Sequence, residues 1–90
     1  MLNEFSRTEL ILGAEAMTKL KSSRVAVFGI GGVGGYTVEA LVRSGIGAID
    51  LIDSDKVSIT NINRQIYALR STIGEYKVDV AKKRILDITI

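Results

Sequence analysis

Apolar residues recur with a helical period toward both ends of the chain. Between Phe5 and Lys21 they fall at three- and four-residue steps, which predicts one short helix, or two helices separated at Gly13. The same period returns from Val78 to Ile88, where charged side chains occupy the opposite face. We therefore expect helices at the start of the fold and an amphipathic helix after residue 77.

Two short apolar stretches between these helices predict parallel β-strands. Arg24–Phe28 (RVAVF) is β-branched and apolar on both faces, as in a buried parallel strand, and Ala48–Ile52 (AIDLI) is a second such segment. Val33 to Ser44 follow a helical period between them, and Gly45 is suited to end that helix. The order strand, helix, strand is a βαβ unit, whose strands run parallel.

The remaining segments complete the fold prediction. Residues 54–72 are polar and irregular, with one helical turn expected around Asn61–Tyr67, and Ile88–Ile90 is expected to begin a third strand. The predicted fold class is α/β: a Rossmann-like βαβ unit with parallel strands, N-terminal helices and an incomplete doubly wound sheet. Because such folds usually need about 100–200 residues, we expect residues 1–90 to be the N-terminal part of a single domain.

A glycine-rich loop joins the first predicted strand to the helix that follows it. Residues 29–35 (GIGGVGG) contain five glycines and match G-x-G-x-x-G at Gly29, Gly31 and Gly34. Glycine permits a tight turn and lets backbone approach phosphates, and the helix N-terminus favours an anion. A plain turn that binds nothing is the simpler alternative, but five glycines cost backbone entropy that such a turn does not require.

Polar residues after the second strand favour ATP over NAD. Asp53 follows the glycines by about 20 residues, where an acidic side chain accepts hydrogen bonds from ribose in either kind of site. The cations Arg64 and Lys77 suit the β- and γ-phosphates of a triphosphate, and Asn61 and Gln65 supply amide dipoles beside them. Each residue alone is more simply a solvated loop residue, so the inference rests on their combination.

Composition narrows the chemistry that these residues can perform. Apolar residues make up 47% and charged residues 24% of the chain, which is typical of a globular domain. With neither cysteine nor histidine, the chain has no disulfides, no thiolate metal sites and no histidine acid or base. A net charge of +2 is too small to indicate nucleic acid. The short apolar runs and the absence of a leader pattern predict a soluble, cytoplasmic protein without membrane contact.

Three motifs together resemble a known protein family. The segments GIGGVGG, LIDSDKVSITNINRQ and TIGEYK occur in the order and spacing of the ubiquitin-activating-enzyme-like superfamily that includes ThiF, MoeB and HesA. The resemblance extends over residues 5–88. Within the superfamily, FSRTELILG, the run from SRVAVFG to RSGIG and INRQIYAL are most similar to the bacterial tRNA threonylcarbamoyladenosine dehydratases.

The resemblance implies roles for individual residues. Gly32 would lie against the ATP phosphates, and Asp55 would support the nucleotide contacts from behind. Arg7 aligns with an arginine that dimers of the family pass to the partner's ATP, although an ordinary surface arginine explains its position equally well. The expected catalytic residues are Arg7, Arg64 and Lys77, and the expected nucleotide-binding residues are Gly29, Gly31, Gly32, Gly34, Asp53, Asp55, Asn61, Arg64, Gln65 and Lys77.

The implied activity is ATP-dependent adenylation. A carboxylate or carbonyl oxygen attacks the α-phosphate, pyrophosphate leaves, and the adenylate is displaced in a second step. In the dehydratases the activated threonylcarbamoyl carboxylate on a tRNA adenosine closes to a ring in that step and releases AMP, so that the nucleoside has lost one water overall. The implied partners are ATP, tRNA and a second copy in a homodimer. Magnesium is implied with the nucleotide, but the family's aspartate ligand is expected beyond Ile90, so no metal site is expected in residues 1–90. The alternatives are adenylation of a ubiquitin-like sulfur-carrier protein and a catalytically inactive, truncated nucleotide-binding fragment.

Overall fold

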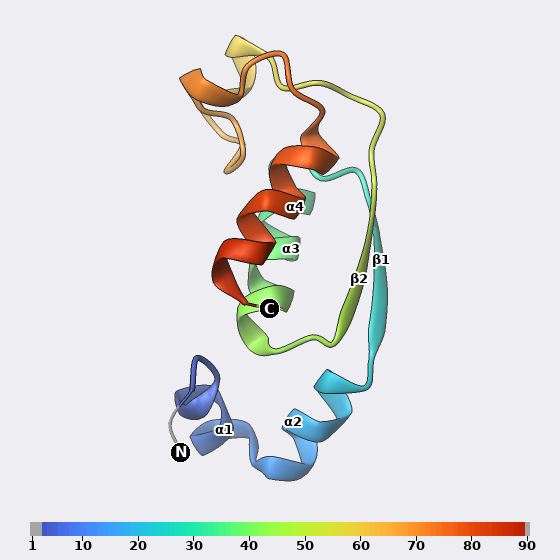
Figure 1. Cartoon of the computed structure of the whole chain (residues 1–90), viewed down its shortest axis with the longest axis vertical. Helices are drawn as coiled ribbons and strands as arrows, with labels where there is room; N and C mark the ends of the chain where they lie inside the picture. Colours follow the sequence, from blue (N-terminus) through green and yellow to red (C-terminus); the bar gives the residue numbers. More distant parts are fainter. Residues whose placement is uncertain (1–2, 90) are drawn as a thin grey trace.

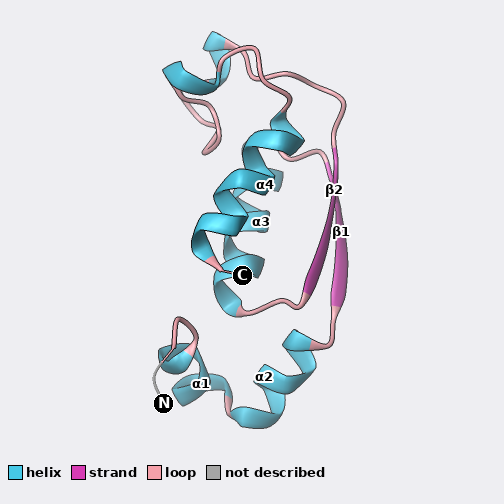
Figure 2. Ribbon diagram, viewed as in Figure 1, coloured by secondary structure: helices cyan, strands magenta, loops and turns pink. Residues whose placement is uncertain are grey.

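The computed structural model describes residues 3–89, which form a βαβ unit with a pair of short helices at one end (Figures 1 and 2). The predicted α/β class is confirmed. In chain order the elements are α1 (Ser6–Leu12), α2 (Ala14–Lys21), β1 (Arg24–Phe28), α3 (Gly32–Ser44), β2 (Ala48–Ile52), the 3₁₀ turns η1 (Ile59–Asn61) and η2 (Arg70–Thr72), and α4 (Lys77–Ile88).

The two strands pair in parallel over their whole length. Arg24 lies opposite Ala48 at one end of the register and Phe28 lies opposite Ile52 at the other. Both strands therefore end at the same edge of the sheet, where the glycine loop follows β1 and Asp53 follows β2. Parallel pairing thus brings two segments together that are more than twenty residues apart in sequence.

The core lies between the sheet and the helices α3 and α4, which stand on the same side of the strands in Figure 1. Helix α3 packs against both β1 and α4. Its buried valines are spaced four residues apart and so lie on one face of the helix. The buried apolar residues are Val27, Ile30, Val38, Val42, Val57, Tyr67, Ala68, Val80 and Ala81.

Helices α1 and α2 lie at the end of the long axis farthest from η1 and η2 (Figure 1). The predicted break at Gly13 is confirmed, because this glycine has a φ of 88°, which a side-chain-bearing residue rarely adopts. No residue of α1 or α2 is buried. Among residues 3–89, no helix has the length and apolar character needed to cross a membrane.

Two local predictions differ from the structure. Ile88 is the last residue of α4 rather than the start of a strand, because the apolar face that begins in the core continues to it; Thr89 is extended and Ile90 lies outside the described residues. The helical turn expected at Asn61–Tyr67 begins earlier, at η1, because Ser58 caps it. It ends in a turn in which the Gln65 N–H donates to the Asn61 carbonyl at 2.9 Å.

Candidate functional site

The glycine loop makes a tight connection from β1 into α3. Gly29 and Gly32 have φ values of 78° and 47°, in the left-handed region that favours glycine. At Gly34, a Cβ would lie 1.7 Å from the carbonyl oxygen of Gly29, so no other residue fits without separating the helix from the loop. Backbone geometry therefore accounts for these three glycines even before any ligand is considered.

The loop is open on one side and covered on the other. Around the position of a Cβ on Gly32, no atom of the described residues lies within 4 Å, apart from Gly32, its chain neighbours and the backbone of the first turn of its own helix. At Gly31 the equivalent position is 2.8 Å from the side-chain amide nitrogen of Gln65. The N–H groups in the first turn of α3 and the positive end of its dipole face this region and favour an anion.

Asp53 ties the end of β2 to the glycine loop. Its Oδ2 accepts a hydrogen bond from the Ile30 N–H at 2.9 Å, and its Oδ1 accepts one from the Asp55 N–H at 2.8 Å. Partial burial alone would raise the pKa of Asp53, but these two N–H donors and the charge of Lys77 outweigh it and lower the pKa below its ordinary value. The carboxylate is therefore ionised at neutral pH and retains lone pairs for further donors.

Lys77 begins α4 beside the same edge of the sheet. Its N–H donates to the Asp55 carbonyl at 3.0 Å, and its Nζ lies 4.0 Å from Asp55 Oδ2. The residue is 7% exposed, which is unusual for lysine. An antiparallel bridge between Lys56 and Tyr76 holds the start of α4 against the segment after β2. The structure thus brings Lys77, Asp53 and Asp55 together at one edge of the sheet.

Asn61 and Arg64 have contacts within their own loop. The buried Asn61 side chain accepts a hydrogen bond from the Ser58 N–H at 2.9 Å and so shapes the turn. The exposed guanidinium of Arg64 donates to the Thr60 carbonyl at 2.9 Å and to Asn63 Oδ1 at 2.8 Å. Of this segment, it is the Gln65 side chain that the structure places on the glycine loop.

Arg7 lies apart from all of these residues. It is exposed on α1, at the opposite end of the molecule from the segment after β2 (Figure 1). Within one chain the structure therefore does not bring Arg7 to the glycine loop. The expectation that it reaches the nucleotide of a partner copy stays a prediction.

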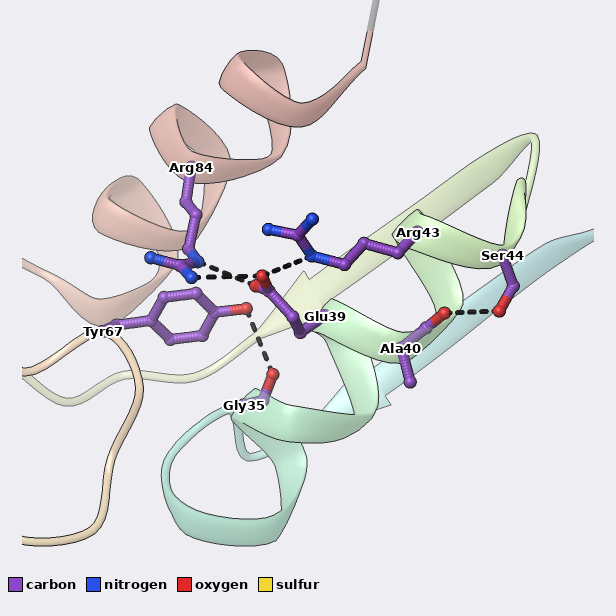
Figure 3. Close-up of polar contacts among 7 residues, drawn as sticks. All are labelled: Gly35, Glu39, Ala40, Arg43, Ser44, Tyr67 and Arg84. Atoms are coloured by element: carbon purple, nitrogen blue, oxygen red, sulfur yellow. Dashed lines mark hydrogen bonds and ion pairs between the residues drawn. The ribbon is translucent and has the colours of Figure 1, made fainter. Parts of the chain in front are cut away.

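An ion-pair network between α3 and α4 was not predicted from the sequence. Glu39 Oε2 accepts a hydrogen bond from Arg84 Nε at 2.8 Å, and Glu39 Oε1 accepts one from Arg43 Nε at 2.8 Å (Figure 3). The bond from Arg84, with that from Arg43, outweighs burial and lowers the pKa of Glu39. Burial, with the charge of Glu39, raises the pKa of the neighbouring Tyr67 to about 12. Only the i, i+4 spacing of Glu39 and Arg43 was visible in the sequence.

The side chains of residues 3–89 do not by themselves form a magnesium site. Within residues 3–89 there is no group of three or more His, Cys, Asp or Glu side chains placed to hold a metal ion. Both carboxylate oxygens of Asp53 already accept backbone N–H groups. No step of the chemistry is therefore assigned to a metal held by these residues.

A hollow of about 280 Å³ lies between residues 66–75 and α4, and no residue of the glycine loop lines it. Its rim mixes the acids Glu75 and Asp87 with the bases Lys83 and Arg84, so it has no preference for one sign of charge. The glycine loop offers the N-terminus of α3 and the open space at Gly32, which suit a phosphate better. We therefore take the loop and its neighbours as the candidate site.

Comparison with known proteins identifies the family. Residues 5–90 match the model of the ThiF family. Because this match covers nearly the whole chain, the chain belongs to the ThiF family, as the motifs predicted.

Particular members of the family are similar over most of the chain. The tRNA threonylcarbamoyladenosine dehydratase of Bacillus subtilis is 58% identical over 88 residues, which are 98% of this chain and 35% of that protein. A sulfur carrier protein adenylyltransferase of Thermus thermophilus is 35% identical over 74 residues, or 82% of this chain and 27% of that protein. The chain spans about a third of the length of the curated relatives it matches.

A solved structure also matches the fold closely. The crystal structure of the Escherichia coli tRNA N6-threonylcarbamoyladenosine dehydratase, TcdA, in complex with ATP superposes with a TM-score of 0.94 at 46% identity. The match covers 96% of this chain and 35% of that one. The arrangement of β1, α3, β2 and α4 is therefore that of an ATP-binding member of the family.

Proposed function

We propose that this chain provides the nucleotide-binding part of an ATP-dependent adenylating enzyme, as the N-terminal part of a single domain. The proposal rests on the open space at Gly32, at the N-terminus of α3, with the Gln65 amide against the adjacent Gly31. Lys77 lies beside Asp53 and Asp55 at the same edge of the sheet. The ATP complex of the similar dehydratase supports the choice of nucleotide. The nearly buried Lys77, which lies beside Asp55 at the same edge of the sheet, supports a triphosphate because it places a cation where phosphate oxygens can be neutralised.

Each residue has a distinct part in the proposed reaction. The glycine loop and the α3 N-terminus bind phosphate oxygens, and Asp53 orients the ribose through its remaining lone pairs. Lys77 and Arg64 stabilise the charge that develops on the phosphates as pyrophosphate leaves. Arg64 must first turn away from Thr60 and Asn63, which costs little because its side chain is exposed. Asp55 keeps the Lys77 ammonium at the edge of the sheet.

The substrate that we propose is the threonylcarbamoyl carboxylate of a modified tRNA adenosine. Support comes from the greater identity to the dehydratase than to the sulfur carrier protein adenylyltransferase. In this proposal, the protein acts in the cytoplasm as a homodimer in which Arg7 reaches the partner's nucleotide. Magnesium accompanies the ATP and is held outside the residues described here.

The test uses the protein expressed from its complete gene. It is incubated with ATP and with tRNA that carries threonylcarbamoyladenosine, and the nucleoside is examined by mass spectrometry. We expect tRNA-dependent release of pyrophosphate and a nucleoside that has lost one water. Adenylation of the C-terminus of a sulfur-carrier protein, without a change in the tRNA, would favour the other branch of the family. No pyrophosphate exchange with either acceptor would favour an inactive nucleotide-binding protein.

A further inference from the structure

Tyr67 is buried between the segment after β2 and helix α3. It is 3% exposed, and its hydroxyl donates a hydrogen bond to the Gly35 carbonyl at 3.3 Å (Figure 3). The high pKa of Tyr67 means that this hydroxyl keeps its proton and remains a donor at all physiological pH values. Tyr67 has no assigned role among the expected site residues.

Gly35 connects Tyr67 directly to the glycine loop. Its N–H donates to the Gly31 carbonyl at 3.4 Å, in the first turn of α3. A Cβ at Gly35 would lie 3.3 Å from Tyr67 Cε2, so the tyrosine ring packs tightly against this turn. A displacement of Tyr67 would therefore act on the part of α3 that begins the candidate phosphate site.

The same segment touches the loop at a second point, two residues earlier. The Gln65 side chain covers Gly31, while the Tyr67 side chain contacts Gly35. Thr72 Oγ1 donates a hydrogen bond to the Tyr67 carbonyl at 2.7 Å and so fixes the backbone of Tyr67. Gln65 is thus held between a turn closed by Asn61 on one side and the anchored Tyr67 on the other.

We infer that Tyr67 is a positioning residue, which holds the Gln65 amide against Gly31 of the glycine loop by anchoring the segment to Gly35. The inference rests on the proposed function, because it assumes that Gln65 contacts the nucleotide. Tyr67 itself contacts the helix rather than the nucleotide, so its effect on binding passes through Gln65.

A double-mutant cycle on ATP affinity tests this coupling in the protein expressed from its complete gene. Tyr67→Phe keeps the ring and removes the bond to Gly35, and Gln65→Ala removes the amide. We expect each change to weaken ATP binding by about two- to tenfold, as for the loss of one hydrogen bond. We expect the double variant to bind no more weakly than Gln65→Ala alone.

Two further variants separate positioning from a general loss of stability. Thr72→Val removes the hydroxyl that bonds the Tyr67 carbonyl and the Leu69 backbone, without touching the ring, and it should weaken ATP binding only when Gln65 is present. Tyr36→Phe, at an exposed tyrosine of the same helix, should leave affinity unchanged. Circular dichroism of every variant checks that the fold is retained.

The outcomes are distinguishable. Two results would overturn the inference but not the proposed function. In the first, the losses of ATP affinity in the two single variants add up in the double variant. In the second, Gln65→Ala binds ATP weakly while Tyr67→Phe binds it normally. Unchanged affinity in Gln65→Ala would overturn both the phosphate contact of Gln65 and its positioning by Tyr67. Failure of the unmodified protein to bind ATP would overturn the proposed function itself.

Discussion

The Asp53 carboxylate accepts a hydrogen bond from the Ile30 backbone N–H at 2.9 Å, and this contact joins the end of β2 to the glycine loop after β1. Asp53 was expected only to bind ribose. In the structure it also fixes the loop that would receive the phosphates. One side chain therefore links the two halves of the candidate nucleotide site, so its charge affects both stability and binding.

Replacing Asp53 with Asn should destabilise the fold by about 1–3 kcal/mol at neutral pH, because two hydrogen bonds lose their charged acceptor. The pKa of Asp53 is lowered in the folded protein. Its stabilisation is therefore complete above the unfolded pKa, near 3.9, and is lost as the pH falls through the folded value. Urea unfolding at pH 7 and pH 3 measures the free energy of unfolding of the unmodified protein and of Asp53→Asn. The difference between the two free energies should be smaller at pH 3. An equal difference at both pH values would contradict a stabilising role for the Asp53 charge.

Two glycines of the loop should respond differently to substitution. Gly34→Ala should cost about 3 kcal/mol, because its Cβ would overlap the Gly29 carbonyl. The methyl group of Gly32→Ala would enter open space, so this variant should cost only about 1–2 kcal/mol, for placing a residue with a side chain in the left-handed conformation. We expect Gly32→Ala to keep the fold but to lose ATP affinity, since the methyl group enters the phosphate space. Thermal melting and ATP titration report the two effects, and unchanged affinity in Gly32→Ala would contradict the assignment.

Lys77→Met and Arg64→Ala should slow adenylation more than they weaken ATP binding. Interactions that strengthen as pyrophosphate leaves lower the barrier, and removing one typically costs about a hundredfold in rate. Single-turnover kinetics and equilibrium ATP binding separate the two quantities. Lys82→Met, at an exposed position of the same helix, is the matched control. If the adenylation rate and the ATP affinity fell by equal factors, Lys77 and Arg64 would contribute to ATP binding and not specifically to stabilising the transition state.

The ion pairs of Glu39 and Asp50 should contribute unequally to stability. The Glu39 side chain is 12% exposed and holds α4 on α3 through Arg84, so Glu39→Gln should cost about 1–2 kcal/mol after screening of the half-exposed arginine. Asp50 pairs with Arg24 on the open face of the sheet, and Asp50→Asn should barely change the melting temperature. If Glu39→Gln and Asp50→Asn lowered the stability of the protein equally, burial would not determine how much each ion pair contributes.

The sequence predicted the strands and helices because their apolar periods are regular and glycines mark their ends. Gly13 and Gly45 end helices, as expected from their freedom to adopt positive φ. The end of α4 was less predictable, since Ile88 continues both a helical period and an apolar run. Only packing against the core selects the helix there.

The sequence predicted that several residues would share one site, but it did not predict their contacts. Sequence motifs identified Gln65 and Lys77, which the segment after β2 and the start of α4 bring close to Gly31 and Asp53, respectively. They could not indicate that Arg64 turns toward its own loop, because an exposed guanidinium finds whichever acceptors are near. Nor could they reveal the bond between Tyr67 and Gly35, since it joins residues 32 positions apart and depends on how the segment after β2 folds back.

The most direct test of the account is a comparison of ATP and NAD⁺ binding by isothermal titration of the protein expressed from its complete gene. The site as described has cations for a triphosphate and an acidic residue that suits either ribose. We predict that ATP binds more tightly than NAD⁺, and that Lys77→Met reduces this preference. Tighter binding of NAD⁺, with no effect of Lys77→Met, would contradict the assignment of this glycine loop to an ATP-dependent adenylating enzyme.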